Sequence, residues 1–218
     1  MPRSPEPQLR RFTAAELATH WVFGVLMIVL IATAACLYLP SLSILVGNRP
    51  TVRMIHIVSG FLLPVPIILA IASRAFRDDA GRLNRFTRND WRWLKSSRRR
   101  TGLIPVGKFN AGQKLNAAFV LGSLILMFAT GAIMTFNSYF PDMIRTGSTF
   151  VHDWLALAIV IVVVGHLYMA FRDAGALYGM GTGRVSLAWA EREHDVWAAQ
   201  EVAAGAVISA SPPKSPTP

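Results

Sequence analysis

The sequence contains a single cysteine, Cys36, among its 218 residues. Iron–sulfur clusters are held by several cysteine thiolates and c-type haem by a CxxCH motif, so this chain can carry neither. A disulfide bond within the chain is excluded by the same count. An iron–sulfur cluster that serves this protein must therefore belong to a partner subunit.

Charged residues are almost absent from four long apolar stretches. Each stretch is about 19 to 22 residues long, enough for an α-helix to cross a hydrocarbon core about 30 Å thick. Together the stretches hold one formally charged residue, Asp153, in a chain that is 53% hydrophobic and 16% charged. The sequence therefore predicts an all-α membrane protein, a bundle of four transmembrane helices. The predicted spans are residues 21–39, 54–73, 115–136 and 150–171.

The second span contains two prolines, Pro64 and Pro66. A proline inside a helix lacks the backbone N–H that would bond to the preceding turn. We therefore expect a kink at this point of the second span.

Basic residues outnumber acidic ones by 22 to 12, and their positions indicate a topology. Three precede the first span, twelve lie in the loop 74–114 and four follow the last span, whereas the other two loops hold only Arg49, Arg53 and Arg145. By the positive-inside rule, both termini and the loop 74–114 are expected to be cytoplasmic. The basic excess is thus attributed to topology and to contact with membrane lipid, and no nucleic acid is expected as a partner.

Four of the five histidines lie in or at the edges of the predicted spans. With alternating helix directions, His56 and His152 reach the same depth on the outer side of the membrane, and His20 and His166 reach another on the inner side. In the fourth span, His152 and His166 are 14 residues apart, which on a helix is about 21 Å, and within about 40° of one face. We call His56 with His152 the outer pair, and His20 with His166 the inner pair. Two imidazoles that face each other across a bundle suit the two axial positions of haem iron, so the sequence predicts two b haems, one ligated by each pair.

These histidines admit further roles on sequence alone. A single histidine can lie at the headgroup boundary or hydrogen-bond between helices. Zinc or copper also binds imidazole, but each pair lacks the third and fourth ligands that these metals usually take. Haem is favoured by small residues one turn after each histidine, because a flat macrocycle needs room beside its ligands. These small residues are Gly24, Gly60, Ala156 and Ala170. The fifth histidine, His194, lies in the polar stretch WAEREHDVW and is expected to be a solvated surface residue.

The chain is expected to divide into four parts. The N-terminal apolar run is expected to be retained, because it is long for a signal peptide and cleavage would remove His20. The C-terminal tail is rich in Pro and Ser and is expected to be disordered. The parts are a cytoplasmic N-terminal segment (1–19), a transmembrane dihaem cytochrome b domain (20–172, with the cytoplasmic loop 74–114), a cytoplasmic amphipathic C-terminal segment (173–202) and the tail (203–218).

The stretch VGKFNAGQKLN, residues 106–116, stands directly before the third span. Asn110 followed three residues later by Gln113 matches an N-terminal capping box, so these residues are expected to begin a helix. The same two amides, at the cytoplasmic edge of the bundle, could instead donate hydrogen bonds to a quinone carbonyl. Both roles are open on sequence alone.

Three features together resemble a known family: the order of the four histidines, GKFNAGQK (107–114) before the third span, and HLYMAF (166–171) at the end of the fourth. They resemble the cytochrome b (gamma) subunit of membrane-bound respiratory formate dehydrogenases over about residues 11–197. The histidine pattern is shared more loosely with the cytochrome b subunits of Ni–Fe hydrogenases.

The resemblance implies a four-helix anchor with two b haems in the bacterial cytoplasmic (inner) membrane. Such an anchor receives electrons from a periplasmic molybdenum or tungsten catalytic subunit through an iron–sulfur subunit, and it reduces menaquinone or ubiquinone in anaerobic respiration. It further implies that Asn110 and Gln113 line the quinone site. The predicted activity is therefore that of an electron-transfer subunit of a formate:quinone oxidoreductase.

Three other functions are open. A cytochrome b subunit of a hydrogenase or of another molybdoenzyme would share the histidines and differ mainly at GKFNAGQK. A stand-alone b-type cytochrome that reacts with superoxide or ascorbate would purify without partner subunits. A haem-free anchor or transporter would purify as a colourless protein.

Overall fold

The computed structural model describes residues 6–97 and 102–208. The chain divides into two compact units. One, which we call the span unit, consists of Ala18–Arg77 and Asn116–Tyr168. The other, which we call the terminal unit, consists of Met1–Leu17, Asp78–Leu115 and Met169–Pro218.

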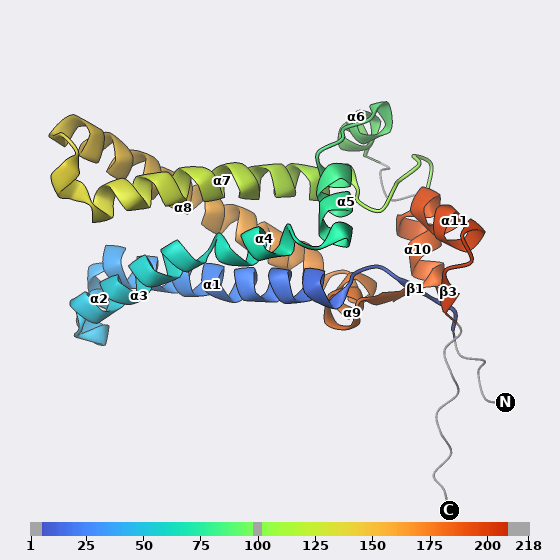
Figure 1. The fold of residues 1–218 in the computed structure, drawn as a ribbon, viewed down its shortest axis with the longest axis horizontal. Coiled ribbons are helices and arrows are strands. Elements are labelled where there is room, and N and C mark those ends of the chain that lie inside the picture. The colour runs from blue at the N-terminus through green and yellow to red at the C-terminus, as the bar shows by residue number, and fades with distance from the viewer. Residues whose placement is uncertain (1–5, 98–101, 209–218) are drawn as a thin grey trace, which may run out of the picture. The chain divides into compact units, whose positions relative to one another are not determined.

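The described chain is mainly α-helical (Figure 1). Within it, four helical stretches are long and apolar enough to cross a membrane: Ala14–Tyr38, Arg49–Ala70, Ala111–Thr135 and Asp142–Phe171. The predicted all-α membrane protein with four spanning helices is thereby confirmed. In chain order the elements are β1 (Gln8–Arg10), α1 (Ala14–Tyr38), α2 (Pro40–Val46), α3 (Arg49–Leu62), α4 (Val65–Ala70), α5 (Arg74–Leu83), α6 (Arg88–Lys95), α7 (Ala111–Thr135), the 3₁₀ helix η1 (Asn137–Tyr139), α8 (Asp142–Phe171), α9 (Ala174–Thr182), β2 (Arg184–Ser186), α10 (Leu187–Glu193), α11 (Asp195–Ala203) and β3 (Val207–Ile208).

The spanning helices begin earlier than the apolar runs because polar capping residues start them. Before α1, the side chain of Glu16 accepts a hydrogen bond from the backbone N–H of Thr13 at 2.7 Å, and the Thr13 hydroxyl accepts one from the backbone N–H of Glu16 at 3.3 Å. Such a reciprocal pair satisfies two backbone donors that a helix start leaves free. Hydropathy alone does not register these turns, because they are polar.

The second span is interrupted where the prolines predict it. Helix α3 ends at Leu62 and α4 begins at Val65. Pro64 lies between them and Pro66 is in the first turn of α4. The helix is therefore interrupted at the position where the kink is expected, because Pro64 supplies no backbone N–H.

The helices of the span unit meet through aromatic and small residues. A Cβ on Gly60 of α3 would lie 3.8 Å from Leu30 of α1, so these two helices approach closely there. The ring centre of Phe61 lies 5.4 Å from that of Phe128 and 6.1 Å from that of Phe136, which joins α3 to α7 and its end. These contacts connect three of the four spanning helices, and the histidines described below connect the fourth.

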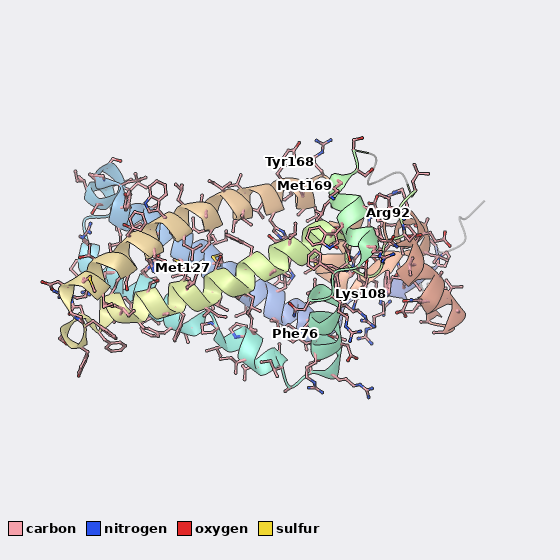
Figure 2. All side chains as sticks on the ribbon, turned by 90° about the horizontal axis from the view of Figure 1, so that it is seen from above. Phe76, Arg92, Lys108, Met127, Tyr168 and Met169 are labelled. Atoms are coloured by element: carbon pink, nitrogen blue, oxygen red, sulfur yellow. The ribbon has the colours of Figure 1, made fainter. Side chains whose placement is uncertain are left out.

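Apolar side chains also point away from the bundle. Figure 2 shows side chains standing out along the length of the long helices α7 and α8. Large apolar side chains among them are well exposed, such as Ile125 (61%) and Ile161 (64%), and α1 contains no buried residue. A helix with apolar residues around its circumference suits a lipid environment. This chain is therefore a multi-pass membrane protein.

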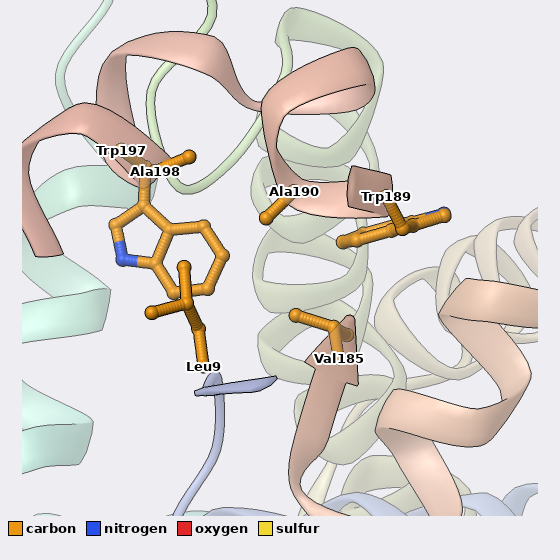
Figure 3. Close-up of a cluster of buried hydrophobic side chains, with 6 residues drawn as sticks. All are labelled: Leu9, Val185, Trp189, Ala190, Trp197 and Ala198. Atoms are coloured by element: carbon orange, nitrogen blue, oxygen red, sulfur yellow. The ribbon is translucent and has the colours of Figure 1, made fainter. Parts of the chain in front are cut away.

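The terminal unit contains a small antiparallel sheet in the strand order β2-β1-β3. Strand β1 lies in the middle, with Leu9 opposite Val185 of β2 and Val207 of β3. Leu9 and Val185 are fully buried in a cluster of apolar side chains from β1, β2, α10 and α11 (Figure 3). The cluster consists of Leu9, Val185, Trp189, Ala190, Trp197 and Ala198. Burying a side chain of this size contributes roughly 1.5–3 kcal/mol, so these few residues hold the sheet and both helices together.

Gly183 connects this sheet to α9. It ends α9 with φ +75°, a left-handed conformation that glycine adopts readily. Its carbonyl oxygen accepts hydrogen bonds from the backbone N–H groups of Arg11 (2.8 Å) and Phe12 (3.1 Å). A Cβ at this position would lie 2.5 Å from the carbonyl oxygen of Phe12, so no larger residue fits.

The polar segments contain more regular structure than the sequence predicts. The loop 74–114 includes α5 and α6, and the segment 173–202 forms α9, α10 and most of α11. In the expected disordered tail, Val207 and Ile208 form strand β3, while residues 209–218 lie outside the described part of the chain.

Candidate functional site

The span unit brings the four predicted histidines together as two pairs. The ring centres of His20 on α1 and His166 on α8 are 6.2 Å apart, with 53° between the ring planes. Those of His56 on α3 and His152 on α8 are 6.4 Å apart, with 66° between the planes. Helix α8 therefore contributes one imidazole to each pair, and the partners are those expected from helix direction and depth.

The distances within the pairs fit one metal ion between two imidazoles. A metal–imidazole bond is about 2.0 to 2.1 Å long and the ring centre lies about 1.1 Å behind the bonded nitrogen, so two opposed rings on one ion have centres about 6.3 Å apart. The observed values are 6.2 and 6.4 Å. Each pair could therefore hold one metal ion, at a separation that suits bis-histidine haem iron.

Each histidine of the outer pair has a threonine hydroxyl beside its Nδ1. The Oγ1 of Thr33 on α1 lies 2.9 Å from Nδ1 of His56, and the Oγ1 of Thr130 on α7 lies 3.0 Å from Nδ1 of His152. The edge of the His152 ring also faces Gly131, where an added Cβ would lie 3.5 Å from Cε1. The outer pair is therefore held by all four spanning helices. Sequence reasoning missed both threonines, although each lies at the depth of its histidine.

The terminal unit contains the other predicted residues, Asn110 and Gln113, immediately before and in the first turn of α7. The side-chain oxygen of Asn110 accepts a hydrogen bond from the backbone N–H of Gln113 at 3.0 Å, and that of Gln113 accepts one from the backbone N–H of Asn110 at 2.9 Å. The predicted capping box is therefore confirmed. Within the described residues, the two amide nitrogens donate no hydrogen bond that would compete with a ligand.

A small cavity borders Asn110 within the terminal unit. It is also lined by Trp93, Val106 and Asp195, and its volume is about 10 Å³. That volume holds one water molecule. A quinone ring is far larger, so it would have to approach these amides from outside this cavity.

Two lysines of GKFNAGQK form buried ion pairs, which sequence reasoning missed. Lys108 Nζ lies 2.5 Å from Asp79 Oδ2 of α5, and Lys114 Nζ lies 2.7 Å from Asp90 Oδ2 of α6. Burial alone would raise the pKa of Asp90, but the hydrogen bonds from Lys114 and Thr87 outweigh it and lower that pKa. Asp79 and Asp90, acidic residues within a strongly basic loop, are the signal that could have identified these pairs.

His194 was expected to be solvated, and that prediction is wrong: the residue is 2% exposed. Its ring lies between Trp189 and Trp197, and Nδ1 donates a hydrogen bond to the carbonyl oxygen of Gly107 at 2.8 Å. Burial, and next the nearby Arg11 guanidinium, lower the pKa of His194 to about 3. The surrounding sequence is polar, but its two tryptophans fold over the imidazole.

Arg11 is also buried, at 4% exposure. Its Nη2 donates a hydrogen bond to the carbonyl oxygen of Lys108 at 3.0 Å, and its guanidinium carbon lies 4.7 Å from the ring centre of Trp189. Burial lowers the pKa of Arg11 to about 10, and the charges of Asp173 and Asp79 act in the opposite direction. GKFNAGQK is thus joined to the N-terminal segment through Arg11 and to the C-terminal segment through His194.

Comparison with known proteins gives the family. A sequence model described as prokaryotic cytochrome b561 matches residues 11–183. The cytochrome b556(Fdn) subunit of the nitrate-inducible formate dehydrogenase of Escherichia coli K12 is 34% identical over 95 residues, which are 42% of this chain and 44% of that relative. In that match the chain spans less than half of the relative's length.

Longer matches cover most of both proteins. The formate dehydrogenase cytochrome b556 subunit of Haemophilus influenzae is 27% identical over 212 residues, which are 89% of this chain and 83% of that relative. The cytochrome b556(fdo) subunit of an Escherichia coli K12 formate dehydrogenase is 26% identical over 196 residues, or 86% and 90% of the two chains. The resemblance drawn from the histidine order and GKFNAGQK is thereby confirmed. The chain belongs to the prokaryotic cytochrome b561 family.

Proposed function

We propose that this chain is the dihaem cytochrome b subunit of a formate dehydrogenase, which anchors the complex in the bacterial cytoplasmic membrane and transfers electrons to quinone. The observation that carries the proposal is the arrangement of four histidines of the span unit as two pairs. The ring centres are 6.2 Å apart within the inner pair and 6.4 Å apart within the outer pair. The named relatives are cytochrome subunits of formate dehydrogenases, which supports formate as the source of the electrons.

In this proposal the chain's own residues hold and orient the redox centres. His56 and His152 ligate the iron of the outer haem b, and His20 and His166 ligate that of the inner haem b. The cofactor supplies the one-electron chemistry. The apolar helices exclude water from the ligands and fix their spacing along α8.

The outer end of the span unit is the proposed dock for an iron–sulfur subunit, which receives electrons from a molybdenum or tungsten catalytic subunit. Helix α2 exposes Ile44 (81%) and Leu45 (82%), the connection from α7 to α8 exposes Tyr139 (82%), and the first turn of α8 exposes Met143 (79%). Apolar side chains grouped in this way commonly mark contact with a protein or with lipid. The basic termini and loop are cytoplasmic in this orientation.

Quinone reduction is assigned to the cytoplasmic side, with Asn110 and Gln113 as donors to a quinone carbonyl. Their oxygens are occupied by the capping box, whereas their amide N–H groups face no acceptor among the described residues. An amide can therefore cap α7 and donate to a ligand at the same time. Menaquinone and ubiquinone both present such carbonyl acceptors.

A set of double variants tests the haem assignment. The native protein should contain two non-covalent haems per chain, measured by acid–acetone extraction and the pyridine haemochrome spectrum. Replacing both histidines of the outer pair (His56→Ala with His152→Ala) should leave one haem, because both changes fall on one site. Replacing one histidine from each pair (His56→Ala with His20→Ala) should leave none. Equal haem contents in the two double variants would overturn the pairing, since each lacks the same number of histidines.

The electron donor is tested in the same preparations. The complex purified in mild detergent should contain an iron–sulfur subunit, and formate should reduce the outer haem even in the His20→Ala variant. Reduction by hydrogen but not by formate would leave the haem sites in place and replace formate dehydrogenase with hydrogenase as the partner.

A further inference from the structure

Two threonines on different helices contact the imidazoles of the outer pair in the same way. Thr33 on α1 and Thr130 on α7 each place Oγ1 within 3.0 Å of an imidazole Nδ1. Both threonines also bond back to their own helix: Oγ1 of Thr33 lies 2.7 Å from the carbonyl oxygen of Val29, and Oγ1 of Thr130 lies 2.7 Å from that of Leu126.

The back-bonds fix the direction of the hydrogen bonds to the rings. A hydroxyl has one proton, and each threonine donates it to the carbonyl one turn earlier in its helix. The hydroxyl oxygen must then accept the proton of Nδ1 from the imidazole. A neutral imidazole with its proton on Nδ1 has a free lone pair on Nε2. The threonines thus select the tautomer that binds metal through Nε2.

We propose that Thr33 and Thr130 are positioning residues of the outer haem site: by accepting the Nδ1–H of His56 and His152 they orient both ligands, strengthen their donation to iron and lower the reduction potential of the outer haem. The proposal rests on the proposed haem function. A partner that accepts the second N–H of a metal-bound histidine fixes the ring and raises its basicity. A more basic ligand stabilises ferric iron more than ferrous iron, and so lowers the potential.

Among the described residues, no threonine supports the inner pair in this way. In residues 6–97 and 102–208, no side chain hydrogen-bonds to the rings of His20 or His166, whose described ring contacts are with each other and with Trp21. The two sites therefore differ in the groups that support their ligands. The hydrogen bonds bias the outer haem toward giving up its electron to the inner haem, which is the inward direction.

Isosteric variants test this role in the purified complex. Thr33→Val and Thr130→Val keep the volume of the side chain and remove its acceptor. Loss of such a partner typically weakens metal binding about tenfold or more. If ferric haem alone loses a factor of ten, the midpoint potential of the outer haem rises by about 59 mV. Each haem is followed by optical redox titration, and the ligand-ring orientation by the EPR spectrum of the ferric form.

The chain offers a matched control in Thr135, on α7 like Thr130. Its Oγ1 donates back to the carbonyl oxygen of Gly131 at 2.7 Å, and it is five residues beyond Thr130, the residue that reaches His152. Thr135→Val should leave both potentials unchanged. Thr33→Ser and Thr130→Ser retain the hydroxyl and should restore the native outer potential, while the inner potential should stay constant throughout.

The outcomes separate this proposal from the function on which it rests. Native protein without an outer haem would overturn the dihaem function itself. Native protein with both haems, but with valine variants that titrate like Thr135→Val, would overturn the role of the threonines and leave the dihaem function standing. A shift of the inner haem instead of the outer one would also overturn it.

Discussion

Replacing Lys114 with methionine should destabilise the terminal unit, because it leaves a buried carboxylate without its cation. Lys114 Nζ donates hydrogen bonds to Asp90 Oδ2 at 2.7 Å and to the carbonyl oxygen of Arg85 at 2.8 Å. The side chains of Lys114 and Asp90 are only 10% and 9% exposed. Methionine has a similar length and no charge, so the change removes the interaction while retaining most of the apolar stem.

The expected size follows from the partners that Asp90 keeps. Removing one member of a buried ion pair costs about 3–5 kcal/mol. Asp90 still accepts hydrogen bonds from the backbone N–H of Thr87 at 2.7 Å and from its hydroxyl at 2.8 Å, so we expect about 3 kcal/mol. In a chain of this length that corresponds to a fall in melting temperature of roughly 6–12 °C. Adding Asp90→Asn removes the uncompensated charge and should recover a large part of this loss.

Thermal unfolding in detergent, followed by tryptophan fluorescence, measures the effect. Trp93 belongs to the buried cluster with Val106 and Ala111 and reports on this region. Arg145→Met is the control, since Arg145 pairs with the exposed Asp142 (87% exposed side chain) and should change the melting temperature little. If Lys114→Met melts within about 2 °C of the native protein, or if the double variant melts lower than Lys114→Met alone, the reasoning about a buried ion pair is refuted.

Two further predictions concern the same unit. Asn110→Leu and Gln113→Leu should slow the reoxidation of the reduced haems by quinone, while formate should still reduce both haems. If these variants lose about 1 kcal/mol of stability but are reoxidised at the native rate, helix capping is the only role of the two residues. His194→Gln should flatten the dependence of stability on pH. Burial lowers the pKa of His194 to about 3, so the folded protein holds the imidazole neutral. The unfolded chain instead takes up a proton on this imidazole below about pH 6.5. The stability of the native protein should therefore be complete above that pH and fall as the pH drops toward 3. Thermal melts across this range measure the effect. If the native and variant proteins lose stability equally in acid, the burial of His194 is contradicted.

The spans and the histidine pairs could be predicted because their signals are local and rigid. Nineteen or more apolar residues with at most one charge have few other structures open to them, and the fixed rise of a helix converts the spacing of His152 and His166 into depth. The interruption at Pro64 follows from the missing N–H of one residue type. Each of these inferences needs only the neighbouring sequence.

The remaining features depend on residues far apart in the chain. The buried imidazole of His194 donates its hydrogen bond to Gly107, 87 positions away, and the polar sequence around His194 carries no sign of this. Thr33 and Thr130 reach histidines 23 and 22 positions along the chain. Threonine is common in membrane helices, so only the three-dimensional structure distinguishes these two from Thr135.

Strand β1 has a consequence for biogenesis. Its three residues, Gln8–Arg10, pair on both sides with strands that begin only at Arg184 and Val207. The ribosome therefore releases the first element of the sheet long before its partners exist, and all four membrane helices are synthesised in between. The buried core around Leu9 can close only after α10 and α11 have been made, so closure of this core follows the synthesis of all four membrane helices.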